Sequence, residues 1–149
     1  MALTIRPATL DDLQSILAIE QASANAARWS REQYSRVVES GLVLVADDKE
    51  TVAGFICAQG VAGEWEIENI VVAESSRRRG IGNTLVSELL KQIGSRSGRT
   101  VYLEVRESNH PARCLYQKHG FVEIGLRRSY YQRPAEDALL YRLSLTTGV

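Results

Sequence analysis

Short apolar runs separated by polar or turn-forming residues predict a chain that alternates between β-strands and α-helices. The strands are expected at residues 3–6, 42–46, 52–59, 65–72, 101–105, 121–126 and 138–145. Helices are expected where capping residues precede apolar positions at helical spacing, namely after Thr9, Ser30 and Asn109, and from Gly80 onward. Ser30 and Gln33 also have the spacing of a capping box.

The order of these elements predicts the kind of sheet. The first two long strands, joined by the polar residues 47–50, form a hairpin, and residues 65–126 run strand, helix, strand, helix, strand. Because crossover helices connect parallel strands, this second stretch predicts local parallel pairing. The sequence therefore predicts an α/β fold, a mixed central sheet flanked by helices, in one domain spanning residues 1–149.

The composition is that of an average globular protein and argues against several classes of function. The 149 residues are 44% hydrophobic and 24% charged, which suits one domain. Lysine plus arginine and aspartate plus glutamate each number 18, so we expect no direct nucleic-acid partner and no membrane partner. The N-terminus lacks the order of a signal peptide, and the longest apolar stretch, residues 42–46, is too short to span a bilayer. A soluble cytoplasmic protein is expected.

The chain offers few ligands for a metal ion. Cys57 and Cys114 lack the spacing of a metal-binding pair, and His110 and His119 are the only histidines. We therefore expect no metal, and thiols that stay reduced in the cytoplasm.

A glycine-containing turn follows the strand that ends near Val72 and opens a helix. It runs from Arg77 to Thr84 and contains Gly80 and Gly82. Glycines let a backbone approach a ligand closely, and a helix N-terminus offers N–H donors and a positive dipole end, which suits a pyrophosphate. A solvated charge run beside an ordinary turn is the alternative. The turn lacks the third glycine of GxGxxG and the Gly-Lys-Ser/Thr of a Walker loop, which favours a different phosphate-bearing cofactor.

The spacing Arg77-x-x-Gly80-x-Gly82 resembles the acetyl-CoA signature of the GNAT N-acetyltransferases, Q/R-x-x-G-x-G/A. The predicted order of elements is similar to the GNAT fold along essentially the whole chain. The resemblance implies that acetyl-CoA lays its pyrophosphate on this turn and its pantetheine arm on the preceding strand, which splays from its neighbour. The residues so implied are Ile70, Val71 and Val72 on the strand and Arg77, Arg78, Arg79, Gly80, Ile81, Gly82, Asn83 and Thr84 on the turn.

A carboxylate, an amide and a phenol lie where they could carry acid–base chemistry. Glu104 is near the end of an otherwise apolar strand, where desolvation would raise its pKa and make it a better base. Asn109 and Tyr116 lie two helical turns apart on the next helix, and so on nearly the same face. An amine with a pKa near 8 must lose a proton before it attacks, and a leaving thiolate must gain one. The structural alternatives are an ion pair of Glu104 with Arg106 or another base, and a half-buried aromatic role for Tyr116.

The segment from Glu104 through Asn109 and Tyr116 to Phe121 resembles one branch of the family, which acetylates the N-terminal alanine of a small-subunit ribosomal protein. The resemblance implies that Glu104 is the proton acceptor, that Asn109 contacts coenzyme A and that Tyr116 is the proton donor. Residues 127–131 resemble a Tyr-Tyr-containing loop that borders the peptide groove in that branch, although these aromatics could equally close the end of the sheet. Glu68 is a rival base, because other branches use a carboxylate on the strand before the turn.

The prediction is an N-acetyltransferase that uses acetyl-CoA and acts on the N-terminal α-amine of a protein, with alanine preferred. A ribosomal protein is the partner that the resemblance implies, and a monomer or weak dimer is expected. Arg28, which replaces a proline of that branch, concerns peptide specificity and leaves the cofactor prediction intact. Two other functions stay open. One is acetylation of a small amine such as a polyamine or aminoglycoside, for which Glu64, Glu66 and Glu68 would supply acidic charge. The other is a non-catalytic acyl-CoA-binding regulatory module.

Overall fold

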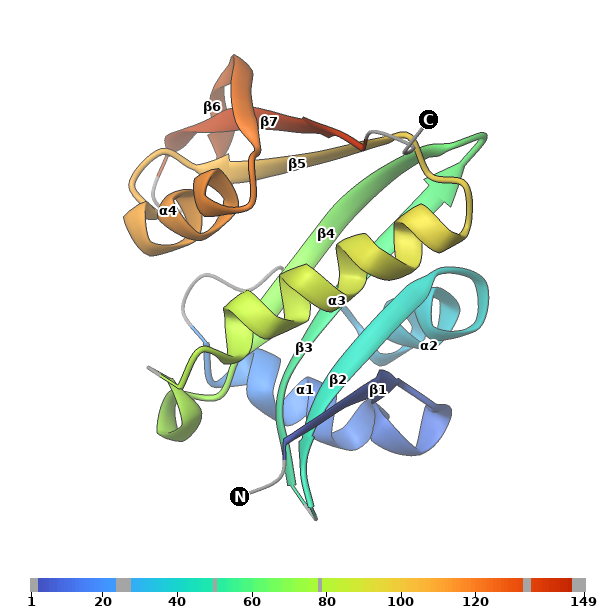
Figure 1. The fold of residues 1–149 in the computed structure, drawn as a ribbon. Coiled ribbons are helices and arrows are strands. Elements are labelled where there is room, and N and C mark those ends of the chain that lie inside the picture. The colour runs from blue at the N-terminus through green and yellow to red at the C-terminus, as the bar shows by residue number, and fades with distance from the viewer. Residues whose placement is uncertain (1–2, 24–27, 50, 78, 133–134, 146–149) are drawn as a thin grey trace. The chain divides into compact units, whose positions relative to one another are not determined.

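The computed structural model describes residues 3–23, 28–49, 51–77, 79–132 and 135–145. Figure 1 shows the strands and helices in order. The strands are β1 (Thr4–Pro7), β2 (Leu42–Asp48), β3 (Thr51–Val61), β4 (Glu64–Val72), β5 (Thr100–Arg106), β6 (Val122–Tyr131) and β7 (Glu136–Ser144). The α-helices are α1 (Leu13–Gln21), α2 (Arg31–Ser40), α3 (Ile81–Ser95) and α4 (His110–Lys118), and two short 3-10 helices lie at Leu10–Asp12 and Glu74–Ser76. Each predicted strand and helix is present, and β6 is longer than predicted because it continues to Tyr131.

The strands form a seven-stranded sheet in the order β1-β2-β3-β4-β5-β7-β6. β1 pairs with β2 and β2 with β3 in antiparallel fashion, whereas β4 and β5 are parallel, as the crossover through α3 predicts. β5 and β6, which α4 connects, do not pair directly, because β7 lies between them and is antiparallel to both. The prediction of a mixed α/β sheet is confirmed, and the C-terminal strand determines how its last part is arranged.

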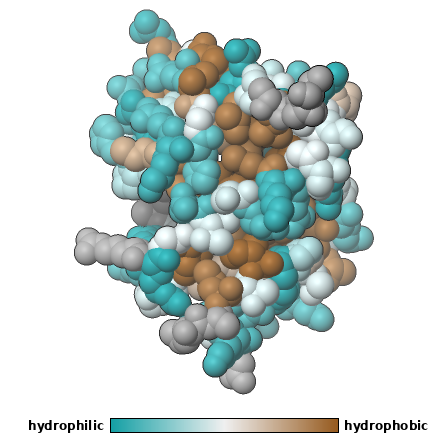
Figure 2. All heavy atoms as spheres, in the orientation of Figure 1, coloured by the Kyte–Doolittle hydropathy of each residue, from teal (hydrophilic) through white to brown (hydrophobic). Residues whose placement is uncertain are grey.

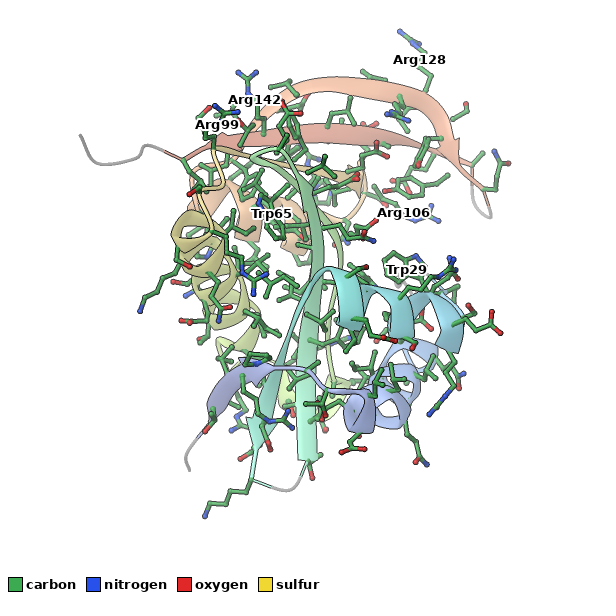
Figure 3. The ribbon with its side chains drawn as sticks, turned by 90° about the vertical axis from the view of Figure 1, so that its right-hand side faces the viewer. Trp29, Trp65, Arg99, Arg106, Arg128 and Arg142 are labelled. Atoms are coloured by element: carbon green, nitrogen blue, oxygen red, sulfur yellow. The ribbon has the colours of Figure 1, made fainter. Side chains whose placement is uncertain are left out.

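Contacts within the chain group it into two compact units. Unit 1 comprises Met1–Gln59 and Glu68–Gln92, and unit 2 comprises Gly60–Ile67 and Ile93–Val149. Within unit 1, α1 and α2 cover one face of the strands and α3 covers the other (Figures 1 and 3). Because both faces are covered, β2 is buried along its whole apolar run from residue 42 to residue 46.

Unit 2 is built on β5, β7, β6 and α4. Along β5, Val101, Leu103 and Val105 are buried, whereas the residues between them are partly exposed. Glu104 is one of those alternate residues, so its side chain lies on the opposite face of the strand from the buried valines and leucine. α4 adds Tyr116, which is 4% exposed, to the core of this unit.

The predicted caps begin two of the helices. The Ser30 hydroxyl accepts a hydrogen bond from Gln33 N at 3.2 Å, and Ser30 N donates to Gln33 Oε1 at 2.8 Å, which completes the capping box of α2. Asn109 begins α4, where its Oδ1 accepts from Ala112 N at 3.3 Å. In both cases a side chain near the start of the helix satisfies a donor that has no acceptor within the helix, which determines where the helix begins.

A buried chain of polar groups in unit 1 was not predicted from the sequence. Glu20 on α1 is 2% exposed, and its Oε1 accepts hydrogen bonds from Trp29 N at 2.5 Å and from the Tyr34 hydroxyl at 3.1 Å. Asn69 Nδ2 on β4 donates to the same hydroxyl at 2.7 Å. Tyr34 therefore connects α1 to β4 and satisfies a carboxylate whose burial would otherwise be costly.

Replacing Tyr34 with phenylalanine is expected to lower the free energy of unfolding by about 1–3 kcal/mol, because Asn69 loses its acceptor and Glu20 loses a donor inside the core. Urea denaturation followed by circular dichroism measures the change. Tyr102→Phe, at a partly exposed position on β5, is the matched control and is expected to change stability by less than ~0.5 kcal/mol. Equal losses from the two variants would show that the hydrogen bonds of Tyr34 contribute nothing specific.

Large apolar side chains at the surface gather on β6. Val122, Ile124 and Leu126 are 56%, 45% and 46% exposed. On the face drawn in Figure 2, hydrophobic patches alternate with hydrophilic side chains. In the described part of the chain, no helix has both the length and the apolar composition needed to cross a membrane.

Candidate active site

The turn predicted to bind a pyrophosphate leads into α3 through Gly80. Gly80 has a φ of +73°, and a Cβ placed on it would find no atom within 4 Å, so the turn is open at this point. A side chain there would face open space but would strain the backbone, which explains why glycine suits this position. Thr84 donates to Gly80 O through its N at 3.0 Å and through its hydroxyl at 2.9 Å, which ties the turn to the first turn of α3.

The arginines of this turn already have partners in the chain. Arg77 Nε donates to Val72 O at 3.3 Å, and Arg79 Nη1 lies 3.2 Å from Asp48 Oδ2. Arg78 lies outside the described residues. Ile81 is buried and belongs to the core side of α3, whereas Asn83 and Thr84 are exposed. The first turn of any α-helix presents N–H groups that lack acceptors within the helix, so the backbone from Gly80 to Thr84 suits an anion better than the arginine side chains do.

The strand before the turn has a ladder with β5 that covers only part of its length. The pairs run from Glu64 with Thr100 to Ile67 with Leu103, although β4 itself continues to Val72. Along this remaining part of β4, Val71 is buried, and Ile70 and Val72 are partly buried. Backbone groups of a strand beyond its ladder can pair with an extended ligand, which is the arrangement that a pantetheine arm needs.

Glu104, the predicted base, forms an ion pair with a residue of β6 that was not predicted as its partner. Its Oε1 lies 3.3 Å from Arg127 Nη2 of β6, and the two side chains are 17% and 56% exposed. Arg106, the partner considered from the sequence, instead lies 3.3 Å from Glu136 Oε1 on β7. The structural alternative for Glu104 is therefore correct in kind, since the carboxylate is ion-paired, but the partner comes from another strand.

Two arginine–tyrosine contacts lie in the same part of unit 2 as Glu104. The guanidinium carbon of Arg127 lies 5.3 Å from the Tyr130 ring centroid, and that of Arg106 lies 4.3 Å from the Tyr131 ring centroid. The negative charge of Glu104, burial and a hydrogen bond to Glu104 raise the pKa of Tyr130. Burial, followed by the charge of Glu104, raises the pKa of Tyr131 to about 12. The charge of Glu104 therefore contributes to the raised pKa of both tyrosines.

A bulge in β6 brings these side chains to one face. In a regular strand Arg127 and Tyr130 would point to opposite faces, yet both reach Glu104. The pairing of β6 with β7 shifts register between Arg127 and Tyr131, and Ser129 has a φ of +51° within that interval. Ser129 N donates to Asp137 Oδ1 at 2.8 Å, which holds the bulge against β7.

Replacing Asp137 with alanine is expected to loosen this bulge, because Ser129 loses its acceptor. We expect the free energy of unfolding to fall by about 1 kcal/mol and kcat/KM for an amine acceptor to fall severalfold. Thermal denaturation and steady-state kinetics measure the two effects. Asp137→Asn keeps an oxygen acceptor and is expected to lose less of both quantities. A loss in Asp137→Asn equal to that in Asp137→Ala would mean that the charge, rather than the hydrogen bond to Ser129, matters.

Tyr116 is buried on α4, where its ring contacts that of Phe121 with centroids 5.7 Å apart. Burial raises the pKa of Tyr116 well above its usual value, and the charge of Tyr131 raises it further. Tyr131 carries charge effects from Glu104 and on Tyr116. The two predicted catalytic side chains, Glu104 of β5 and Tyr116 of α4, both belong to unit 2. Cys114 is exposed on α4, two residues from the buried Tyr116, and so lies on a different face of the helix.

The other two predicted polar residues have structural partners. Asn109, implied to contact coenzyme A, uses its Oδ1 to cap α4. Glu68, the rival base, accepts a hydrogen bond from Gln59 Nε2 at 2.9 Å in unit 1. Arg127, which the sequence placed in a loop that resembles the border of a peptide groove, pairs with the predicted base, and no role for it was predicted from the sequence. Its signal would have been the excess of positive charge directly before the two tyrosines.

Comparison with known proteins identifies the family. Residues 10–121 match the acetyltransferase (GNAT) family. The chain belongs to this family. It is 35% identical to the [ribosomal protein bS18]-alanine N-acetyltransferase of Salmonella typhimurium and 34% identical to that of Escherichia coli K12, each over 96% of this chain and 98% of the relative.

Solved structures agree with this assignment. The crystal structure of the ribosomal-protein-S18-alanine N-acetyltransferase from Escherichia coli matches with a TM-score of 0.89 and 31% identity, over 99% of this chain and 97% of that chain. Ard1 from Thermoplasma volcanium matches with a TM-score of 0.91 and 26% identity, over 99% and 100% of the two chains. The predicted GNAT fold and the prediction of an acetyltransferase are confirmed. Acetyl-CoA is the acetyl donor of GNAT acetyltransferases, and the open, glycine-containing turn at the start of α3 fits its pyrophosphate.

Proposed function

We propose that this GNAT acetyltransferase transfers the acetyl group of acetyl-CoA to the N-terminal α-amine of a protein, with alanine as the preferred first residue and a ribosomal protein as the natural acceptor. The observation that carries the proposal is the presence in unit 2 of the Glu104 carboxylate, on the less buried face of β5, and of the buried Tyr116 phenol on α4. Unit 2 combines a carboxylate that can accept a proton with a buried phenol that stays protonated. The relatives named above, which are [ribosomal protein bS18]-alanine N-acetyltransferases, support the choice of acceptor.

Residues of unit 1 would bind the donor. The backbone of Ile70–Val72 would pair with the pantetheine arm, and the backbone from Gly80 to Thr84 would accept the pyrophosphate oxygens at the start of α3. Arg77 and Arg79 are within the same turn, so either guanidinium could exchange its present partner for a phosphate oxygen. Backbone N–H groups near Val71 would stabilise the oxyanion that develops on the acetyl carbonyl.

Glu104 and Tyr116 would carry the proton transfers. An α-amine has a pKa near 8 and is mostly protonated at pH 7, so Glu104, directly or through a water, would take the proton that blocks attack. The amine then attacks the acetyl carbon without passing through an acyl-enzyme. Tyr116 would donate a hydrogen bond, and finally its proton, to the sulfur that leaves. Positioning of the amine would supply much of the remaining acceleration.

The test is an acetylation assay with defined acceptors. The protein is incubated with acetyl-CoA and peptides beginning with Ala, Ser, Met or Gly, and mass spectrometry locates the acetyl group. Peptides with a blocked N-terminus and a free lysine, together with spermidine, serve as controls. We expect acetyl on the free α-amine of the alanine-first peptide, at a higher rate than on the other peptides.

The other outcomes each contradict the proposal in a recognisable way. Acetyl on spermidine or lysine alone would move the protein to a different substrate class within the family. Binding of acetyl-CoA without transfer to any acceptor would favour a regulatory module that binds acyl-CoA.

A further inference from the structure

The carboxylate of Glu104, proposed as the base, is already ion-paired with an arginine of the same chain. Arg127 Nη2 lies 3.3 Å from Glu104 Oε1 and reaches it from β6, the strand at the end of the sheet order. Glu104 has a side chain only 17% exposed, whereas that of Arg127 is 56% exposed. The carboxylate is therefore the fixed partner of this pair, and the guanidinium is the partner that faces solvent.

We propose that Arg127 occupies, in the substrate-free enzyme, the place beside Glu104 that the ammonium group of the acceptor takes when it binds. This inference rests on the proposed function, since it assumes that Glu104 receives the acceptor amine. Arg127 is then a specificity-determining residue. It admits an acceptor that arrives as a cation, because one positive charge replaces another at a carboxylate that is poorly exposed to water.

The chemistry of the surroundings favours such an exchange. Leaving a poorly exposed carboxylate without a cation costs free energy, so a neutral acceptor cannot displace Arg127 as easily as an ammonium can. An ion pair with one exposed partner is weak, so the exchange is not prohibitive. The Tyr130 ring, whose centroid is 5.3 Å from the guanidinium carbon, offers Arg127 a second favourable contact when it leaves Glu104.

The other charged groups near Glu104 are arranged differently from Arg127. Arg106 on β5 is ion-paired with Glu136 and stacks on Tyr131. Glu66 on β4 contributes negative charge at Tyr130, which favours a cation in this region without supplying one. The residue of β7 opposite Glu104 is the apolar Leu140. Among the described residues, Arg127 is accordingly the cation found in an ion pair with Glu104.

The decisive measurement is the affinity for the acceptor when Arg127 is removed. The Kd of an alanine-first peptide is measured by calorimetry on protein saturated with coenzyme A. Arg127→Gln is expected to lower this Kd about two- to fivefold, the range that a partly exposed ion pair is worth. Arg127→Lys keeps a cation and is expected to stay close to the unmodified protein. Steady-state kinetics are expected to show a lower KM for Arg127→Gln, with kcat changed less than KM.

Arg128→Gln is the matched control. Arg128 is the next residue along β6, is exposed, and points away from the sheet on the opposite side from Arg106 (Figure 3). It removes the same charge from the same strand, so it should leave the Kd unchanged. A decrease in Kd as large in Arg128→Gln as in Arg127→Gln would show that net charge, and not the exchange at Glu104, is responsible.

Combination with Glu104→Gln separates this role from a structural one. Without the Glu104 carboxylate, Arg127 and the peptide ammonium no longer compete for the same anion. Arg127→Gln should therefore leave the peptide Kd unchanged in the Glu104→Gln background. An unchanged or raised Kd for Arg127→Gln alone, or the same decrease in both backgrounds, would overturn the proposal. If the unmodified protein bound no peptide, the proposed function would fail as well. Equal peptide affinity of the unmodified protein and Arg127→Gln would overturn only the role of Arg127.

Discussion

Replacing Glu104 with glutamine is expected to lower kcat by ~10²–10⁴, the usual contribution of a positioned base. Glutamine keeps the size and the oxygen of the side chain but cannot accept a proton from an ammonium group. The substitution also breaks the ion pair with Arg127. Because the Glu104 side chain is 17% exposed and does not belong to the apolar core, we expect the fold to be retained. Affinity for acetyl-CoA should stay the same, because Glu104 is not among the residues expected to contact acetyl-CoA, and those proposed for its pantetheine arm and pyrophosphate belong to unit 1. Stopped-flow or coupled detection of free coenzyme A thiol, with calorimetry for acetyl-CoA, measures both quantities.

Glu68→Gln is the comparison that decides between the two candidate bases. Glu68 lies on β4 and accepts a hydrogen bond from Gln59, which glutamine at position 68 can still accept through its amide oxygen. We expect kcat to change by less than threefold, as is usual for a surface substitution away from the reacting atoms (about 0.5 kcal/mol). A large loss in Glu68→Gln together with a normal rate in Glu104→Gln would assign the base to β4.

The parts of the site that depend on local sequence could be predicted, and the parts that depend on strand pairing could not. The turn at Gly80 is specified by neighbouring residues, because a positive φ and the start of α3 both follow from the chain within one turn. The cap formed by Asn109 is equally local. The alternation along β5 also places Glu104 on the less buried face without reference to any other strand.

The partner of Glu104 depends on two events that the chain order hides. β7 must enter between β5 and β6, and β6 must bulge near Ser129. Only then do Arg127 and Tyr130 reach the same carboxylate. The sequence predicts a strand that ends at residue 126 and a loop at residues 127–131, because arginines, serine and tyrosines show no alternation of apolar and polar positions. The carboxylate of Asp137, ten residues beyond Arg127, fixes the bulge through a single hydrogen bond.

The buried Glu20 was missed for a related reason. A glutamate at the end of an amphipathic helix is ordinarily exposed, and the burial of Glu20 depends on two later donors, the backbone N of Trp29 just before α2 and the hydroxyl of Tyr34 on α2. Periodicity detects apolar positions and cannot detect a polar residue whose partners compensate for its burial.

The pKa values of Tyr116 and Tyr131 bear on which of them can donate a proton at neutral and moderately alkaline pH. Both are raised in pKa mainly by burial, Tyr131 to about 12 and Tyr116 further. A group that must be protonated to act loses its function as the pH rises through its pKa, so a raised pKa moves that loss to higher pH. Tyr116 should therefore remain a competent donor throughout the range in which an ordinary tyrosine, with a pKa of about 10, would begin to ionise. The same burial makes full proton release costly, so a hydrogen bond to the departing sulfur precedes proton transfer.

Tyr116→Phe is expected to lower kcat by ~10² or more, because the leaving thiolate loses its donor while the ring keeps its place beside Phe121. The free energy of unfolding should change little, since the ring remains packed against Phe121. The pH profile provides a second measure: in the unmodified enzyme kcat should show no decline from tyrosine ionisation up to about pH 10. Tyr131→Phe is the matched variant. We expect its kcat to fall less than that of Tyr116→Phe, because the Tyr131 hydroxyl affects Glu104 and Tyr116 only through electrostatic interactions. A normal rate in Tyr116→Phe with a large loss in Tyr131→Phe would reassign the proton donor to the end of β6, next to the carboxylate that takes the first proton.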